Sequence, residues 1–252
     1  MITWAGCFVL SIVIPVHNEE AILPSLVRDI TTGLQAVTDD YELILCENGS
    51  ADRTLALAHE LAEQFPAIHV FTSDTPSYGQ AIRTGILHSQ GEHIVVFNAD
   101  LWDLEFLRSA LHLMDFYDIV VASKRHQESH DQRPLQRRFI TWSFNALLRV
   151  LFSFHGSDTH GMKAFRRRRI VPIVESCLTQ REIFDTEVIL RAQRAGLSII
   201  EVPVHVEETR PSRYGLFMRI PRTFHDLSVL YRDLYTVSRT APVELPSEPD
   251  KV

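Results

Sequence analysis

The stretch Leu10-Ser11-Ile12-Val13-Ile14-Pro15-Val16, followed at once by His17-Asn18-Glu19-Glu20, decides the fold class of this chain. The first seven residues are mostly apolar and β-branched, which is typical of a buried strand. Apolar residues then recur with the helical period at Ile22, Leu26, Ile30, Leu34 and Val37. A buried strand, a polar turn and an amphipathic helix over 21–37 indicate the first unit of an α/β sheet.

The alternation of strand and helix continues as far as residue 123. We expect further strands at 41–46, 68–72, 93–97 and 119–122. Between them we expect a helix over 51–65 with Ser50 as its N-cap, and helices over 80–89 and 103–114. Such alternation predicts an α/β fold with a mostly parallel sheet covered by helices on both faces.

The second half of the chain has a different rhythm. A polar loop rich in His and Arg leads to an amphipathic helix, which we expect to form a lobe appended to the sheet. The elements predicted after residue 134 are helices over 135–154, 167–178, 184–195 and 216–235, and strands within 158–165 and 198–206.

Composition narrows the class of protein. The 252 residues are 45% hydrophobic and 23% charged, as in an ordinary globular protein. The three cysteines, Cys7, Cys46 and Cys177, show no C-x-x-C pairing, which argues against a disulfide framework or a zinc site and favours a reducing cytoplasm. We expect no secretion signal, and no membrane span, because Asn145 and Arg149 interrupt the most apolar helical stretch.

Charge is distributed unevenly along the chain, whose net charge is −7. Residues 1–123 carry 4 Lys and Arg against 17 Asp and Glu, a balance of −13, whereas residues 124–169 carry 11 against 3, a balance of +8. The basic segment is either a solvated face or a surface that attracts phosphate or anionic lipid. We expect no nucleic-acid partner, because no recognition-helix or base-stacking motif accompanies the basic residues.

Polar side chains follow each of the first four predicted strands. In an open parallel sheet ligands bind beyond the carboxyl ends of the strands, so these turns are the expected site. Neither G-x-G-x-x-G nor the phosphate-loop spacing occurs, which argues against dinucleotide and P-loop proteins. The turns are His17-Asn18-Glu19, Glu47-Asn48-Gly49-Ser50-Ala51-Asp52, residues 74–80, and Asn98-Ala99-Asp100.

The order of these motifs resembles the family 2 inverting glycosyltransferases, in the branch typified by dolichol- and polyprenol-phosphate mannosyltransferases. The resemblance spans about residues 9–235. It rests on the joint occurrence, in one order, of SIVIPVHNE (11–19), ENGSADRT (47–54), GQAIRTG (79–85), GEHIVVFNADL (91–101), HGMKAFR (160–166), FDTE (184–187) and IEVPV (200–204).

The resemblance implies a GT-A fold and a single domain over 1–235. Its nucleotide-binding half would cover about 9–123 and its acceptor half about 124–235. Beyond them we expect a disordered tail over 236–252, since this segment contains three prolines among acidic residues. We also expect location in the cytoplasm, in keeping with the unpaired cysteines, and peripheral contact with the cytoplasmic face of a membrane through the amphipathic helices over 135–154 and 216–235.

The resemblance also assigns the nucleotide-sugar donor, a GDP- or UDP-sugar, to the turns after the strands. Asn98 and Asp100 take the places of the D-x-D pair, which holds Mg²⁺ or Mn²⁺ on the donor diphosphate. Since Asn98 has no charge, we expect lower metal affinity or a dispensable metal, and Trp102 stands where relatives place a ligating Gln, with Asp103 as a possible substitute. The residues assigned to nucleotide-sugar binding are Pro15, His17, Glu19, Glu47, Asn48, Gln80, Asn98 and Asp100.

For the acceptor, the resemblance implies a polyprenyl phosphate or another phosphorylated or hydroxylated molecule. A phosphate acceptor is already anionic and needs cationic donors more than a base. A hydroxyl acceptor would need a general base, for which Asp158 and Asp185 are equal candidates. The residues assigned to acceptor or phosphate binding are Lys124, Arg125, Arg137, Arg138, Ser212 and Arg213, of which Lys124 and Arg137 also count, with Asp100, among the catalytic residues.

Simpler roles exist for several of these residues. Glu47, Asn48 and Asp52 could cap the following helix, Asp100 could begin one, and Asn98 could serve a turn. The two amphipathic helices could pack on the sheet or rest on lipid. As a whole, the chain could also be a nucleotide-sugar-binding protein that has lost catalysis, or, less in keeping with its acidic first turn, a nucleotidyltransferase.

Overall fold

The computed structural model describes residues 10–123, 135–159, 161–181, 183–204 and 216–237. For 135–140, 216–221 and 236–237 it describes the backbone alone. The strands are β1 (Leu10–Val16), β2 (Tyr41–Asn48), β3 (Ile68–Ser73), β4 (His93–Val96), β5 (Ile119–Ser123), β6 (Lys163–Arg166) and β7 (Ile199–Pro203). The helices are α1 (Leu23–Gln35), α2 (Thr54–Gln64), α3 (Tyr78–His88), α4 (Leu104–Leu113), α5 (Leu135–Phe152), α6 (Arg167–Ser176), α7 (Phe184–Arg194) and α8 (Leu216–Arg232), with a π-helical turn at Asp233–Val237.

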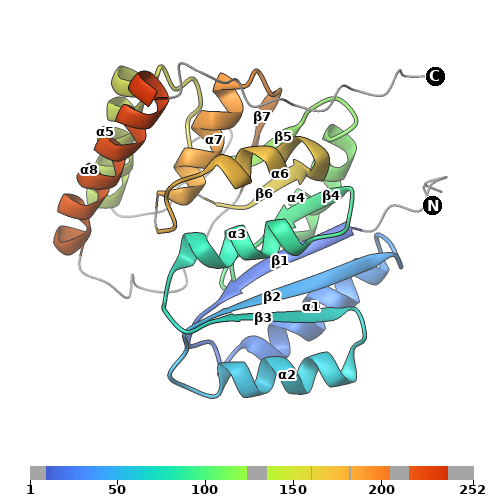
Figure 1. The fold of residues 1–252 in the computed structure, drawn as a ribbon. Coiled ribbons are helices and arrows are strands. Elements are labelled where there is room, and N and C mark those ends of the chain that lie inside the picture. The colour runs from blue at the N-terminus through green and yellow to red at the C-terminus, as the bar shows by residue number, and fades with distance from the viewer. Residues whose placement is uncertain (1–9, 124–134, 160, 182, 205–215, 238–252) are drawn as a thin grey trace.

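The seven strands form one sheet in the order β3-β2-β1-β4-β6-β5-β7 (Figure 1). β1 pairs in parallel with β2 and β4, β2 with β3, and β5 with β7. β6 alone among these runs antiparallel, between β4 and β5. The expected α/β fold with a mostly parallel sheet is therefore confirmed.

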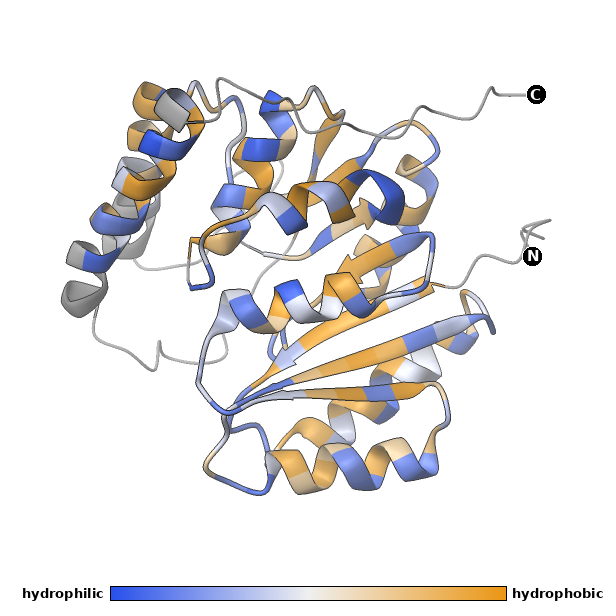
Figure 2. Cartoon of the chain, in the orientation of Figure 1, coloured by the Kyte–Doolittle hydropathy of each residue, from blue (hydrophilic) through white to orange (hydrophobic). Residues whose placement is uncertain are grey.

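Helices cover both faces of the sheet. Because side chains along a strand alternate between the two faces, β1 sends Val13 to one core and Ile12 and Ile14 to the other. The first core lies under α3, α6 and α7, and the second under α1, α2 and α4. The strands are accordingly apolar along most of their length, whereas the helices are apolar on one side (Figure 2).

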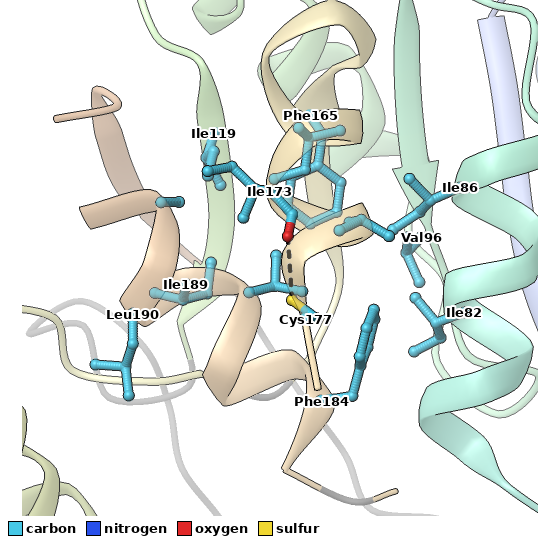
Figure 3. Packing of buried hydrophobic residues seen from close by; sticks show 14 of the residues in the cluster. Ile82, Ile86, Val96, Ile119, Phe165, Ile173, Cys177, Phe184, Ile189 and Leu190 are labelled. Atoms are coloured by element: carbon cyan, nitrogen blue, oxygen red, sulfur yellow. Dashed lines mark hydrogen bonds between the residues drawn. The ribbon is translucent and has the colours of Figure 1, made fainter. Parts of the chain in front are cut away.

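The first core packs α3, α6 and α7 on the sheet (Figure 3). Phe184 and Ile189 of α7, Ile173 of α6 and Ile82 of α3 are all buried there. The thiol of Cys177 donates to the Ile173 carbonyl at 3.3 Å. Burial raises the pKa of the Cys46 thiol to about 12 and raises that of Cys177 as well, so both thiols stay protonated.

The helices α5 and α8 lie side by side at one end of the molecule (Figure 1). Phe152 of α5 contacts Tyr231 of α8, with ring centroids 5.9 Å apart. Hydrogen bonds of Arg191 connect α7 to the end of α8. Arg191 Nε donates to Glu187 Oε1 at 2.7 Å, and Arg191 Nη2 donates at 2.6 Å to Asp233, the first residue of the π-helical turn. The Glu of the FDTE motif therefore has a structural role.

Most predicted bounds lie within two residues of those in the structure, and larger differences occur at α2, β6 and β7. The helix after β2 begins at Thr54 rather than Ala51, and Ser50 is not its N-cap, because the Ser50 hydroxyl instead accepts the Asn18 N–H. The strand expected within 158–165 covers only Lys163–Arg166. The last strand is Ile199–Pro203, shorter than the expected 198–206. The expected tail over 236–252 lies, except for residues 236 and 237, outside the described residues.

Candidate active site

The sheet gathers polar residues at one edge. β1, β2, β3 and β4 are parallel, so their carboxyl ends lie at the same edge. β6 runs the opposite way, and its first residue, Lys163, pairs with Val96 near the end of β4 and Val121 of β5. The start of β6 thus reaches the edge at which its neighbours end.

The turns after β1 and β2 interlock. Asn18 has a left-handed backbone (φ 52°), which Asn tolerates better than most residues. Its N–H donates to Ser50 Oγ at 2.9 Å, and its side-chain oxygen accepts the Ala51 N–H at 2.8 Å. His17 Nδ1 lies 2.6 Å from the Asn48 carbonyl, so Nδ1 carries the proton, because a carbonyl can only accept. The two turns therefore form one rigid rim.

The second turn also holds the loop after β3. Glu47 is buried and accepts the Ser50 N–H at 2.5 Å, while the Asn48 side chain accepts the Ser77 N–H at 2.5 Å. Gly49 has φ 61°, and a Cβ there would lie 2.9 Å from Pro76 Cδ. Only glycine suits this position, because both backbone conformation and space exclude a side chain.

The turn after β4 presents the N-A-D motif. Asn98 and Leu101 exchange backbone hydrogen bonds, each at 3.1 Å, which closes a tight turn with exposed Asp100 inside it. Asp100 does not begin a helix. Asp103 does so, since its side chain accepts the Glu105 N–H at 2.7 Å as the N-cap of α4.

A chain of polar contacts runs inward from Asn98. The Tyr78 hydroxyl donates to Asn98 Oδ1 at 2.9 Å and lies 3.5 Å from Asp185 Oδ2. The same Asp185 oxygen lies 3.1 Å from the Lys163 ammonium. The side chains of Lys163 and Asp185 are 1% and 4% exposed, so this is a buried ion pair. Lys163 also donates to the Gly161 carbonyl at 2.9 Å, which satisfies a further proton.

Burial and the nearby carboxylates of Asp185 and Asp100 raise the pKa of Tyr78 well above its ordinary value. The phenol consequently stays protonated over the working pH range and remains a hydrogen-bond donor. Its orientation, fixed by α3, connects the turn after β4 to the buried ion pair. Neither Tyr78 nor Lys163 was assigned a role from the sequence, although Tyr78 falls within the expected turn over 74–80 and Lys163 within the quoted HGMKAFR motif.

The remaining predicted residues lie in different surroundings. Pro15 is buried in β1 opposite Cys46, and Glu19 is partly buried, its N–H donating to Thr54 Oγ1 at 2.8 Å. Gln80 bonds through its N–H to the Gln180 carbonyl at 2.8 Å, and its buried Oε1 has no hydrogen-bond partner among the described residues. Asp158 is buried, and the N–H of its neighbour Ser157 donates to Glu201 Oε1 at 2.6 Å.

The predicted acceptor residues lie where the structure describes no side chains. Lys124, Arg125, Ser212 and Arg213 lie outside the described residues, and Arg137 and Arg138 belong to α5 at positions described by backbone only. Their roles stay predictions.

The donor set at this edge fits a divalent cation only in part. Among the described residues, no group of three His, Cys, Asp or Glu side chains is arranged to hold a metal. Asp100 is an exposed carboxylate, whereas Asn98 Oδ1 already accepts from Tyr78. One carboxylate together with substrate phosphates is nevertheless a common arrangement for Mg²⁺. The edge therefore fits a cation that arrives with a diphosphate better than one bound by the protein alone.

A mostly parallel sheet with a polar rim beyond its strand ends defines an α/β protein of the nucleotide-binding type. Over residues 11–189 the chain matches the family described as Glycosyl transferase family 2, and it belongs to this family of glycosyltransferases. The resemblance inferred from the motifs is thereby confirmed.

Two relatives illustrate the branch. The chain is 30% identical to the dolichyl-phosphate beta-glucosyltransferase ALG5A of Trichomonas vaginalis, over 81% of this chain and 67% of that one. It is also 30% identical to the undecaprenyl-phosphate 4-deoxy-4-formamido-L-arabinose transferase of an Enterobacter species, over 94% and 69%.

Solved structures support the fold. Glucosyl-3-phosphoglycerate synthase from Mycobacterium tuberculosis, in complex with UDP, has a TM-score of 0.63 at 18% identity, covering 96% of this chain and 90% of that one. The mannosyltransferase PcManGT from Pyrobaculum calidifontis, in complex with GDP-mannose and Mn²⁺, has a TM-score of 0.61 at 21% identity, covering 92% and 65%. These structures confirm the expected GT-A architecture.

Proposed function

We propose that this chain transfers a sugar from a nucleoside diphosphate sugar to a polyprenyl phosphate, with inversion at the anomeric carbon. The donor would occupy the rim formed by the turns after β1, β2 and β4. We also propose that residues 9–235 act as one domain, with donor and acceptor halves. The relatives named for dolichyl and undecaprenyl phosphate support a lipid phosphate as acceptor.

The observation that carries the proposal is the buried Lys163–Asp185 pair. A general base must be able to take a proton, yet the Asp185 oxygen that faces the site already contacts the Lys163 ammonium and the Tyr78 hydroxyl. Asp158, the other candidate base, is buried. A phosphate acceptor requires no base, because its oxygen is already anionic, and so it suits this site better than a hydroxyl.

The proposed step is a direct displacement. An oxygen of the acceptor phosphate forms a bond to the anomeric carbon, and the bond from that carbon to the donor diphosphate breaks. Its electrons leave with the nucleoside diphosphate, and no proton needs to move. The protein would contribute mainly by positioning the two reactants in line.

Asp100 would hold a divalent cation, if one is used, against the donor diphosphate. Such a cation supplies positive charge that stabilises the departing diphosphate. Asn98, oriented by Tyr78, would contribute hydrogen bonding to the donor without charge. We therefore expect the cation to bind together with the nucleotide and to bind weakly without it.

A peripheral position at a membrane would suit a lipid acceptor. Within the described residues, none of the helices has the length and apolar character that crossing a bilayer requires. The helices α5 and α8 nevertheless expose large apolar side chains, among them Trp142 and Phe224, which are 51% and 57% exposed. Amphipathic helices of this kind can rest in the headgroup region.

The test is an assay of the purified chain with UDP- and GDP-sugars, Mg²⁺ or Mn²⁺, and a polyprenyl phosphate. We expect a glycolipid and a nucleoside diphosphate, no product with the unphosphorylated polyprenol, and inverted anomeric configuration by NMR. Asp100→Ala should lower turnover by roughly 100-fold or more. The matched control is Asp115→Ala, an exposed carboxylate after α4, which should leave turnover unchanged.

Three results would contradict the proposal. Transfer to the free polyprenol would indicate a hydroxyl acceptor. Full turnover of Asp100→Ala would remove that residue from the mechanism. Nucleotide-sugar binding without transfer to any acceptor phosphate would favour a binding protein that has lost catalysis.

A further inference from the structure

A small cavity opens beside the N-terminus of α3. Its volume is about 220 Å³, and it is lined by Pro76, Ser77, Tyr78, Arg181 and Arg222. Pockets for drug-sized ligands usually measure roughly 300–1,000 Å³, so this one suits a single chemical group better than a whole nucleotide. Three segments distant in sequence build it: the loop before α3, the loop before α7, and α8.

Two arginines give the cavity its chemistry. Arg181 and Arg222 are both exposed, and neither guanidinium forms a hydrogen bond or ion pair with another described residue. Two like charges that line one small space repel each other unless an anion lies between them. Guanidinium groups bind phosphate through paired, parallel hydrogen bonds, which makes phosphate a well-matched anion.

The backbone adds further donors. α3 is an 11-residue helix, and its first two N–H groups, of Tyr78 and Gly79, donate to no described residue. The N-terminus of a helix favours anions, because these unpaired N–H groups and the helix dipole point the same way. No acidic residue occupies the first turn of α3, so nothing there offsets that preference.

The position of α3 is fixed by close packing. A Cβ on Gly79 would lie 2.5 Å from the Arg181 carbonyl oxygen and 2.5 Å from Phe184 Cβ. Because residue 79 is a glycine, the start of α3 can approach the loop that carries Arg181. The Ser77 hydroxyl donates to the Gln180 carbonyl across the same contact. The cavity is therefore a built feature of two interlocked segments.

One wall of the cavity leads to the donor site. Tyr78 lines the cavity and also donates to Asn98, the first residue of the N-A-D motif. A group in the cavity would thus lie one side chain away from the proposed donor diphosphate. The nearby carboxylate of Asp185 is paired with Lys163, so it does not repel an incoming anion strongly.

We propose that this cavity binds the phosphate group of the acceptor, with Arg181 and Arg222 as its cationic donors. The assignment deepens the proposed function and rests on it for the identity of the acceptor. The lipid chain would then leave the cavity along α8, the helix that carries Arg222. This site uses none of the basic residues that the sequence alone suggested.

The test compares Arg181→Gln, Arg222→Gln and the double variant with Arg108→Gln, an exposed arginine of α4 on the opposite face of the sheet. Each lost charged hydrogen bond should weaken acceptor binding by about 10-fold or more. We expect the KM for a polyprenyl phosphate to rise in both single variants and to rise most in the double variant. Both kcat and the KM for the donor should change little, and Arg108→Gln should behave as wild type.

A binding measurement without turnover separates this proposal from the proposed reaction. The dissociation constants of farnesyl phosphate, inorganic phosphate, UDP and GDP are measured by calorimetry for each variant, after thermal melting has shown that it folds. Selective loss of farnesyl phosphate affinity supports the proposal, even if no glycolipid forms. Equal loss of nucleotide affinity would assign the cavity to the donor, and unchanged affinity for farnesyl phosphate would overturn the site.

Discussion

At the scale of single residues, the unusual feature is an ion pair inside the protein. Lys163 and Asp185 come from β6 and α7 and are both almost fully buried. Removing two charges from water is costly, and their attraction repays that cost only when both partners are present. The pair therefore fixes how α7 packs on the sheet, and Asp185 of the pair also lies 3.5 Å from the Tyr78 hydroxyl.

Loss of one partner should destabilise the protein strongly. Lys163→Met leaves the Asp185 carboxylate buried without its cation, and we expect the free energy of unfolding to fall by about 3–5 kcal/mol. The double variant Lys163→Met/Asp185→Leu should recover much of that loss. Urea denaturation of the two single variants and the double variant measures the effect; a double variant as unstable as the sum of both singles would contradict it.

The turns that form the rim of the candidate site could be predicted from the sequence, and the contacts behind them could not. His17 follows β1, Glu47 lies near the carboxyl end of β2, and Asn98 comes two residues after β4. The rule that ligands bind beyond strand ends predicts all three at one edge of the sheet. Tyr78, Lys163 and Asp185 are distant from one another in sequence. Both Tyr78 and Lys163 contact Asp185, and the contact of Lys163 depends on the direction of β6. No local pattern encodes that direction, because a four-residue strand reads the same either way.

At the scale of elements, α3 is the helix whose Tyr78 connects the turn after β4 to the buried Lys163–Asp185 pair. It packs on β1 and β2 at Gly85, where a Cβ would overlap Val13 Cγ1 and lie 2.9 Å from Cys46 Sγ. Both of these neighbours belong to central strands and cannot move aside easily. Because α3 begins at Tyr78, a displacement of this helix would change the hydrogen bond between Tyr78 and Asn98.

Gly85→Ala should destabilise the protein by about 1–3 kcal/mol, because overpacking outweighs the better helix propensity of alanine. Gly33→Ala is the matched control: it lies within α1, and its added Cβ would meet its nearest atom, Leu104 Cδ1, at an ordinary 3.6 Å. That variant should be neutral or up to about 1 kcal/mol more stable. Thermal unfolding of both proteins decides, and equal destabilisation of the two would contradict the packing argument.

Most elements could be predicted from periodicity, and their ends could not. β1 was expected at Leu10–Val16 and lies there, since its apolar run is bounded by polar residues. The start of α2 was misplaced by three residues, because Ser50 looks like an N-cap but bonds to Asn18, more than thirty residues earlier. Helix ends depend on such distant partners, which a local pattern does not contain.

At the scale of the whole molecule, α5 and α8 form an exposed pair beside the proposed acceptor cavity. We expect the protein to sediment with vesicles that contain anionic lipid at low salt, since apolar burial and charge attraction act together. The double variant Trp142→Gln/Phe224→Gln should bind more weakly. Phe116→Gln, which removes a 67% exposed ring after α4, should bind as wild type.

Absence of vesicle binding at low salt would exclude the peripheral membrane contact. Equal weakening by Phe116→Gln would mean that vesicle binding depends on exposed apolar side chains in general and not on α5 and α8. High salt should weaken the interaction, because screening removes the contribution of charge. The proposed acceptor cavity can be tested separately, because its assay uses a short phosphorylated chain in solution.

The position of Lys163 in β6 constrains the number of residues in the segment that precedes this strand. Successive side chains of a strand face opposite sides of a sheet, so a shift of one residue would turn Lys163 away from Asp185 and bring Met162 or Ala164 in its place. A shift of two residues would keep the same side of the strand toward Asp185 but would place Phe165 or Gly161 there in place of Lys163. The length of the connection between α5 and β6 is thus constrained by charge pairing between β6 and α7, even though most of that connection lies outside regular structure.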